Sequence, residues 1–274
     1  SLLKEAQRIV VKVGTSTLTH ENGKMNLVRM ERLALAISEL MNENKEVILV
    51  SSGAIGVGMG KFNFRRRPLG MGMKQALAAV GQCELMNIYS RLFATYNHTV
   101  AQILLTKADM QDELRKKNIM STFKSLLDFG VLPIVNENDT VSVDEIKSLM
   151  MFGDNDTLSA VVSKVVNADL LIILSDIDGL YDSNPKENKG SKLITTVDAL
   201  TDEIRECAGG SGTNRGTGGM VTKLAAAEIP RVGSCAGPGL ASGGAQVAVG
   251  AAAPGAGVAG EPAGARAGQA AAAA

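Results

Sequence analysis

Five short runs of branched apolar residues limit the fold of this chain more than any other feature. In order, they are RIVVKV (8–13), EVILVS (46–51), TVAQILL (99–105), VLPIVN (131–136) and DLLIILS (169–175). Each run contains few polar residues, which is typical of parallel strands that are covered on both faces. The runs therefore predict a mostly parallel β-sheet that lies between layers of helices.

Segments with a helical pattern separate these runs. They cover about residues 26–44, 73–95, 113–129, 156–167 and 219–229. The alternation of strands and helices predicts βαβ crossovers and an α/β fold. In such folds, ligands bind beyond the carboxyl ends of the parallel strands. We therefore expect a binding site among the polar, glycine-rich segments that follow the strands.

The composition changes abruptly after about Pro230. Residues 231–274 are mostly Ala and Gly and contain no Lys, Asp, Ile or aromatic residue. Such a segment can bury little apolar area. We expect one folded domain over residues 1–230 and a disordered low-complexity tail over residues 231–274 that adds no strand. This expectation leaves open that the fold is incomplete at its C-terminal end.

Several classes of protein are disfavoured. The formal net charge is zero, so nothing argues for a nucleic-acid partner. The three cysteines are too widely spaced for a zinc site or a disulfide framework. The chain has no apolar run of about 18 residues, no signal-peptide pattern, and no dinucleotide-binding or P-loop motif. We expect a cytoplasmic protein that binds neither nucleic acid nor membrane and builds no metal site from its own side chains.

Two lysines accompany glycine-rich segments. VKVGTST (11–17) places Lys12 inside the first strand, and GTGGMVTK (216–223) places Lys223 in the first turns of a helix. Between them, SSGA (51–54) follows the second strand and offers the backbone N–H groups of Ser52, Gly53 and Ala54. Glycine-rich turns and helix N-termini bind phosphate or carboxylate oxygens. Taken singly, each segment could also be an ordinary turn, an edge lysine or a linker.

Two acidic segments, NEND (136–139) and GDND (153–156), lie between apolar flanks. Clusters of Asp and Asn bind ammonium groups or Mg²⁺, or they orient lysines. The alternative is that Asp154 or Asp156 only caps the helix that follows. Two lysine sites and two acidic sites at one sheet edge suit phosphoryl transfer, which needs aligned reactants and neutralised phosphoryl charge.

As a set, these motifs resemble the amino acid kinase family, and within it the members that phosphorylate glutamate. The resemblance runs from Arg8 to about Ile229 and includes VKVGTS, SSGAI, AAVGQ, VNENDT, GDNDTLSA, LSDIDGLYD and GTGGMVTK. It implies a three-layer kinase domain over residues 1–230. It also implies ATP-dependent phosphorylation of the γ-carboxylate of L-glutamate, the first step of proline biosynthesis.

The resemblance further implies a role for each matching residue. Lys12, Asp156 and Lys223 are the implied catalytic residues, with Asp156 orienting the two lysines. The implied glutamate-binding residues are Ser52, Gly53, Ala54, Asn136, Asp139, Asp154 and Asn155. The implied nucleotide-binding residues are Lys12, Gly14, Ser175, Asp176, Thr217, Gly218, Gly219, Met220, Val221, Thr222 and Lys223.

ATP and Mg²⁺ are the implied cofactors, proline is a candidate feedback inhibitor, and assembly into a homo-oligomer is expected. Two alternatives stay open at this point. One is another kinase of the same family, acting on acetylglutamate, carbamate, aspartate or uridylate. The other is a non-catalytic nucleotide- or amino-acid-binding module with a truncated fold.

Overall fold

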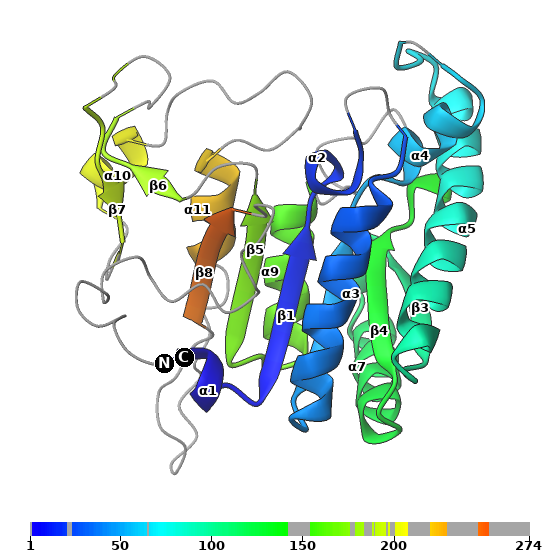
Figure 1. Cartoon of the computed structure of the whole chain (residues 1–274), viewed down its shortest axis with the longest axis horizontal. Coiled ribbons are helices and arrows are strands. Elements are labelled where there is room, and N and C mark those ends of the chain that lie inside the picture. Colours follow the sequence, from blue (N-terminus) through cyan, green and yellow to red (C-terminus); the bar gives the residue numbers. More distant parts are fainter. Residues whose placement is uncertain are drawn as a thin grey trace, which may run out of the picture.

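A parallel β-sheet forms the centre of the computed structural model (Figure 1). The structure describes residues 2–20, 24–64, 66–141, 154–175, 179–183, 188, 190–195, 197, 201–207, 220–228 and 246–251. Within this part of the chain, the sheet contains β1 (Arg8–Val13), β2 (Glu46–Ser51), β3 (Val100–Leu105), β4 (Leu132–Glu137), β5 (Leu170–Ser175) and β8 (Gln246–Ala251), in the order β3-β4-β2-β1-β5-β8. All neighbouring strands are parallel. The five predicted runs are confirmed, each with ends within one residue.

One strand corrects the sequence-based expectation for the tail. β8 pairs with β5 in parallel, from Leu170 opposite Gln246 to Ser175 opposite Ala251. The expectation that residues 231–274 add no strand is therefore wrong over residues 246–251. Pairing along the edge of β5 uses backbone N–H and C=O groups, which an Ala/Val/Gly segment supplies as well as any other. The rest of the tail lies outside the described residues, and the prediction of disorder there stays a prediction.

Helices connect the strands. They are α1 (Leu2–Glu5), α2 (Thr15–Leu18), α3 (Leu27–Asn42), α4 (Ala54–Lys61), α5 (Met71–Thr95), α6 (Lys107–Gln111), α7 (Glu113–Asp128), the 3₁₀ turn η1 (Asp139–Val141), α9 (Asn155–Val165), α10 (Asp202–Cys207) and α11 (Met220–Glu228). A short antiparallel pair, β6 (Leu180–Tyr181) and β7 (Leu193–Ile194), lies outside the main sheet. In Figure 1, α3 lies in front of the sheet and α7 and α9 lie behind it.

Two hydrophobic cores fill the space on the two faces of the sheet. Along β1, Ile9, Val11 and Val13 belong to the core that contains residues of α3 and α5. Val10 belongs to the core that contains residues of α7, α9 and α11. This alternation follows from the pleat of a strand, in which successive side chains point to opposite faces. It confirms a three-layer α/β fold.

Helices α4 and α5 approach each other unusually closely. A Cβ atom added to Gly81 would lie 1.8 Å from the carbonyl oxygen of Ala54, and one added to Gly58 would lie 2.1 Å from that of Leu77. Only glycine fits at such a distance. The crossing holds the middle of α5 against the segment that follows β2.

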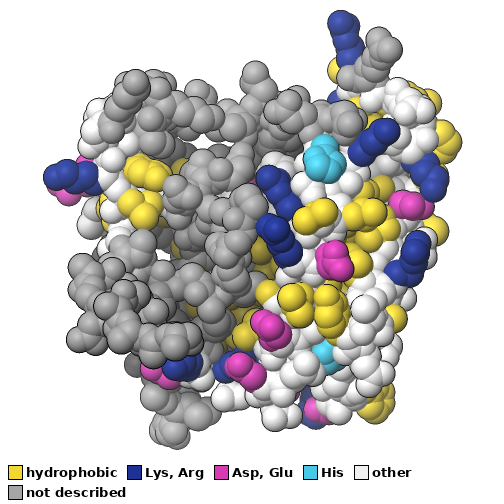
Figure 2. All heavy atoms as spheres, in the orientation of Figure 1, with side chains coloured by type: hydrophobic (Ala, Val, Ile, Leu, Met, Phe, Trp, Pro, Cys, Tyr) yellow, Lys and Arg dark blue, Asp and Glu magenta, His cyan; other side chains and the backbone are white. Residues whose placement is uncertain are grey.

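The surface on the α3 side mixes acidic, basic and apolar side chains (Figure 2). This mixture agrees with the zero formal net charge. Among the described helices, none combines the length and the apolar character needed to cross a bilayer.

Candidate active site

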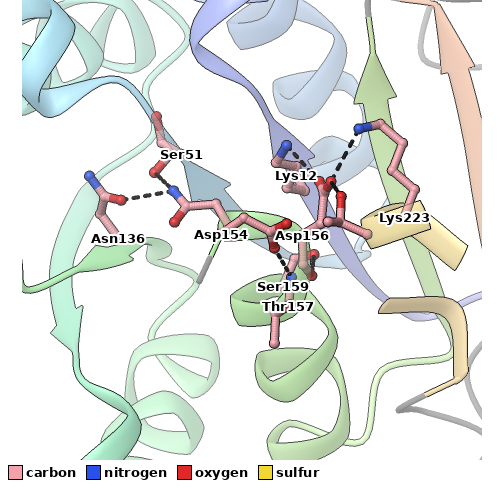
Figure 3. Close-up of polar contacts among 10 residues, drawn as sticks. Lys12, Ser51, Asn136, Asp154, Asp156, Thr157, Ser159 and Lys223 are labelled. Carbon is pink, nitrogen blue, oxygen red and sulfur yellow. Dashed lines mark hydrogen bonds and ion pairs between the residues drawn. The ribbon is translucent and has the colours of Figure 1, made fainter. Parts of the chain in front are cut away.

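One aspartate holds two lysines at the carboxyl edge of the sheet (Figure 3). Lys12 Nζ lies 2.6 Å from Asp156 Oδ1, and Lys223 Nζ lies 3.1 Å from Asp156 Oδ2. The hydroxyl of Thr222 also donates to Asp156 Oδ2, at 3.1 Å. Asp156 is 2% exposed and each lysine is 7% exposed. Residues from β1, α9 and α11 thus meet at one buried carboxylate.

The pleat of β1 explains how Lys12 reaches this position. Its neighbours Val11 and Val13 point toward α3 and α5, so Lys12 points to the opposite face, which α9 covers. Asp156 lies in the first turn of α9, and Lys223 comes from α11, which packs against α9. The three residues therefore meet only because two helices pack beside the end of the first strand.

Electrostatics keep Asp156 ionised. Burial by itself would raise the pKa of this carboxyl group, because it disfavours the charged form. The ammonium groups of Lys12 and Lys223 outweigh burial and hold the pKa of Asp156 below its ordinary value. Two ammonium groups and one carboxylate leave an excess of positive charge, which suits a group that gains negative charge during a reaction.

The described side chains of GDND have three different tasks. Asp154 Oδ1 accepts a hydrogen bond of 2.8 Å from the backbone N–H of Thr157 and caps α9. Asn155 Nδ2 donates to the carbonyl of Ser51 and to Asn136 Oδ1, each at 2.9 Å. Asp156 holds the two lysines. Asp154 therefore does cap α9, whereas Asp156 directs both carboxylate oxygens to lysines.

The turns after β1 and β2 lie side by side near Lys12. The backbone N–H of Ser52 donates to the carbonyl of Val13 at 3.1 Å. Gly53 has φ of +102° and precedes α4, which begins with the buried Ala54. A Cβ on Gly53 would lie 3.6 Å from the side chain of Thr15, and one on Gly14 would lie 3.5 Å from Lys12 Nζ. Two of the predicted glycine-rich segments, the turns after β1 and β2, are thus brought together, and the glycines of GTGGMVTK lie outside the described residues.

The NEND segment lies at the end of β4. Asn136 is buried, and its Oδ1 also accepts from the backbone N–H of Glu137. Asp139 begins η1 and is half-buried. Burial raises the pKa of the Asp139 carboxyl group, while the charge of Arg67 acts in the opposite direction. A carboxylate held at some desolvation cost is suited to a cationic ligand group.

The predicted nucleotide residues are only partly described. Ser175 is buried at the end of β5, and Met220, Val221, Thr222 and Lys223 form the first turn of α11. Asp176, Thr217, Gly218 and Gly219 lie outside the described residues. The hydroxyl of Thr222 contacts Asp156, a partner that the motif did not predict.

The sequence alone did not indicate the importance of two buried polar residues of α5. Gln82 Oε1 accepts a hydrogen bond of 2.9 Å from Asn136 Nδ2, and the hydroxyl of Tyr89 lies 2.9 Å from Ser51 Oγ. Gln82 ends the AAVGQ motif, for which the sequence alone indicates no role. A glutamine among the apolar residues of a helix was the available signal.

A buried lysine pair on one carboxylate, beside glycine-rich turns at the end of a parallel sheet, is an arrangement suited to an α/β protein that binds a phosphorylated ligand. The chain belongs to the amino acid kinase family, whose sequence profile matches residues 7–234.

Relatives with a curated name are similar over most of the chain. This chain is 60% identical over 227 residues to the glutamate 5-kinase of Clostridium perfringens, and the match covers 83% of this chain and 84% of that protein. It is 55% identical over 222 residues to the glutamate 5-kinase of Caldanaerobacter subterraneus, covering 81% of this chain but only 59% of that longer protein. A solved structure of isopentenyl phosphate kinase, 16% identical with a TM-score of 0.54, covers 89% of this chain and 91% of its own. That likeness concerns the fold alone.

Proposed function

We propose that this chain is a glutamate 5-kinase, which uses ATP to phosphorylate the γ-carboxylate of L-glutamate. The product, L-glutamyl 5-phosphate, would begin proline biosynthesis in the cytoplasm. The single observation that carries the proposal is the buried contact of Asp156 with both Lys12 and Lys223. The names of the relatives support glutamate as the substrate.

In the proposed reaction, a γ-carboxylate oxygen of glutamate attacks the γ-phosphorus of ATP. An O–P bond forms as the bond to the departing ADP oxygen breaks, and ADP keeps that electron pair. Lys12 and Lys223 neutralise the charge on the transferred phosphoryl group, and Asp156 keeps both ammonium groups in place. No covalent enzyme intermediate is needed, because alignment and charge neutralisation account for the catalysis.

The glutamate site proposed here lies at the ends of β2 and β4. The turn at Ser52–Ala54 offers the backbone N–H groups of Gly53 and Ala54 to a carboxylate, because the N–H of Ser52 already donates to the carbonyl of Val13. Asp139 and Asn155 offer oxygen acceptors for the α-ammonium group. Asp154 caps α9 through Oδ1, and its Oδ2 is the oxygen that we assign to the substrate. The nucleotide would lie along Ser175 and the first turn of α11.

A magnesium ion accompanies ATP in this proposal. No group of three or more His, Cys, Asp or Glu side chains that could hold a metal occurs in the described part of the chain. Both carboxylate oxygens of Asp156 already face lysines. In this proposal, phosphate oxygens and water supply most of the ligands of the ion, as is usual for Mg²⁺ bound with a nucleotide.

Feedback inhibition by proline and assembly into a homo-oligomer belong to the same proposal. The family resemblance supports both. Assembly has one further support in apolar side chains exposed around α4 and the start of α5: Phe62, Phe64, Leu69 and Met73. Exposed apolar residues that form one contiguous patch often mark a contact surface, whereas single ones are common on any protein.

The test is a coupled assay of ADP release together with trapping of the acyl phosphate by hydroxylamine. Both signals should require L-glutamate, ATP and Mg²⁺ and should disappear when any one is omitted. A higher kcat/KM with carbamate, aspartate or acetylglutamate would reject the substrate. Binding of ATP and glutamate without turnover would favour the non-catalytic module instead.

A further inference from the structure

Gln82 contacts Asn136 of the proposed glutamate site. It is 9% exposed on α5, and its Oε1 accepts from Nδ2 of the buried Asn136 at 2.9 Å. The close crossing of α4 and α5 at the adjacent Gly81 fixes this part of the helix. A buried polar side chain needs a partner, and here the partner is a residue of the NEND segment.

The side-chain amides of three residues form a hydrogen-bonded chain: Gln82, Asn136 and Asn155. Two backbone groups fix whether the oxygen or the nitrogen of each amide faces its neighbour. The N–H of Glu137 can only donate, so it requires the oxygen of Asn136. The carbonyl of Ser51 can only accept, so it requires the nitrogen of Asn155. Asn136 must therefore turn its nitrogen toward Gln82, which receives it with a carbonyl oxygen.

This direction decides what Asn155 offers to a ligand. Its Nδ2 has two N–H groups, and they are used on the carbonyl of Ser51 and on Asn136 Oδ1. The side chain is half-buried, and among the described residues the structure gives no donor to its Oδ1. Asn155 therefore presents a hydrogen-bond acceptor, which suits an ammonium group and not a carboxylate.

We propose that Gln82 is a positioning residue that holds Asn136, and through it Asn155, in the orientation that accepts a hydrogen bond from the α-ammonium group of the amino-acid substrate. The inference rests on the proposed function and adds a residue that determines specificity. Without the oxygen of Gln82, the amide of Asn136 has a buried N–H group unpaired. Asn136 then gains by rotating toward other acceptors, and Asn155 loses the oxygen that fixes its own nitrogen.

The test compares three variants with the wild type. Gln82→Met removes the acceptor but keeps the length of the side chain, and Gln82→Glu keeps an oxygen at the same reach. Lys45→Met is the matched control, because Lys45 is also 9% exposed and uses its ammonium group on the carbonyls of Lys4 and Ala6. Lys45 immediately precedes β2, so it lies at the opposite end of that strand from Ser51.

For each variant we would measure kcat, the KM for glutamate, the KM for ATP, the melting temperature and inhibition by glutarate. Glutarate has both carboxylates of glutamate but no ammonium group. Gln82→Met should raise the KM for glutamate about tenfold, the effect of losing one well-placed hydrogen bond. Its KM for ATP and its inhibition constant for glutarate should stay close to the wild-type values, and Gln82→Glu should recover most of the affinity for glutamate.

The Lys45→Met control should lower the melting temperature with no selective change in KM. If Gln82→Met affects glutamate, glutarate and ATP equally, or only the melting temperature, Gln82 is structural and the inference is wrong. If the wild type shows no glutamate-dependent turnover, the proposed function fails and the inference fails with it. An active wild type with an unaffected Gln82→Met variant overturns the inference alone.

Discussion

The ammonium nitrogen of Lys12 lies 2.6 Å from Oδ1 of Asp156, and both side chains are almost completely buried. A buried ion pair contributes little stability relative to apolar residues of similar size, but removing one partner of it is costly. The position of the pair at the end of β1, beside the glycine-rich turns, points to a role in holding Lys12 in place for a ligand.

The first prediction separates this role from folding. Asp156→Asn should lower kcat roughly 10²–10³-fold, because a neutral amide cannot hold two ammonium groups by charge. Both Asp156→Asn and Asp156→Ala should also destabilise the fold, by about 3–5 kcal/mol, since in either variant two buried lysines lack a counter-charge. Steady-state kinetics and urea denaturation measure the two effects. A kcat near the wild-type value in Asp156→Asn would contradict the catalytic role.

The second prediction concerns pH. The pKa of Asp156 is lowered in the folded state, so its ionised form stabilises the fold above the ordinary aspartate pKa of about 3.9. That contribution is lost as the pH falls through the folded-state pKa. The difference in free energy of unfolding between wild type and Asp156→Asn should be constant near neutral pH and should shrink below about pH 4. Urea titrations across this range measure it, and a difference independent of pH would count against the ion pairs.

The third prediction concerns Lys223. Lys223→Ala should lower kcat roughly 10²–10³-fold, the loss typical of one group that stabilises a transition state. Lys117→Ala, which changes an exposed lysine on α7, is the control and should leave kcat unchanged. If Lys223→Ala raises only the KM for ATP, the residue binds nucleotide in ground and transition states alike.

The fourth prediction concerns the cap of α9. Asp154→Asn should keep the stability of the wild type, because asparagine caps helices as well as aspartate does. Asp154→Ala removes the acceptor for the N–H of Thr157 and should cost about 1 kcal/mol. Thermal denaturation compares the two. If Asp154→Asn raises the KM for glutamate while its stability is unchanged, the other carboxylate oxygen binds substrate as proposed.

The fifth prediction concerns β8. Removal of residues 252–274 should leave the melting temperature unchanged, whereas removal of residues 246–274 should lower it. The second truncation takes away the strand that pairs with β5 from Leu170 to Ser175, and it leaves those backbone groups at an open edge. Equal melting temperatures for both truncated chains would show that β8 adds no stability.

Local pattern was enough to predict the scaffold. Each of the strands β1 to β5 is a mostly apolar run of strand length. A strand that is buried on both faces must be apolar at nearly every position, so the sequence alone reveals it. The glycine-rich turns and the lysines Lys12 and Lys223 were likewise visible, because anion sites need small residues and N–H donors at adjacent positions. The strand β8 was not visible, since edge pairing depends on backbone groups that every residue has.

The sequence by itself therefore determined the class of fold, the edge of the sheet that we propose as the ligand site, and the candidate residues at that edge. Only the tertiary structure decided their partners. It showed that Asp154 caps α9 while Asp156, two residues later, reaches both lysines, and that Gln82 of α5 supports Asn136 of β4. Residues that are distant along the chain meet through the packing of α9, α11 and α5 against the sheet. Whether a side-chain amide donates or accepts a hydrogen bond there depends on the partner that the packing places beside it.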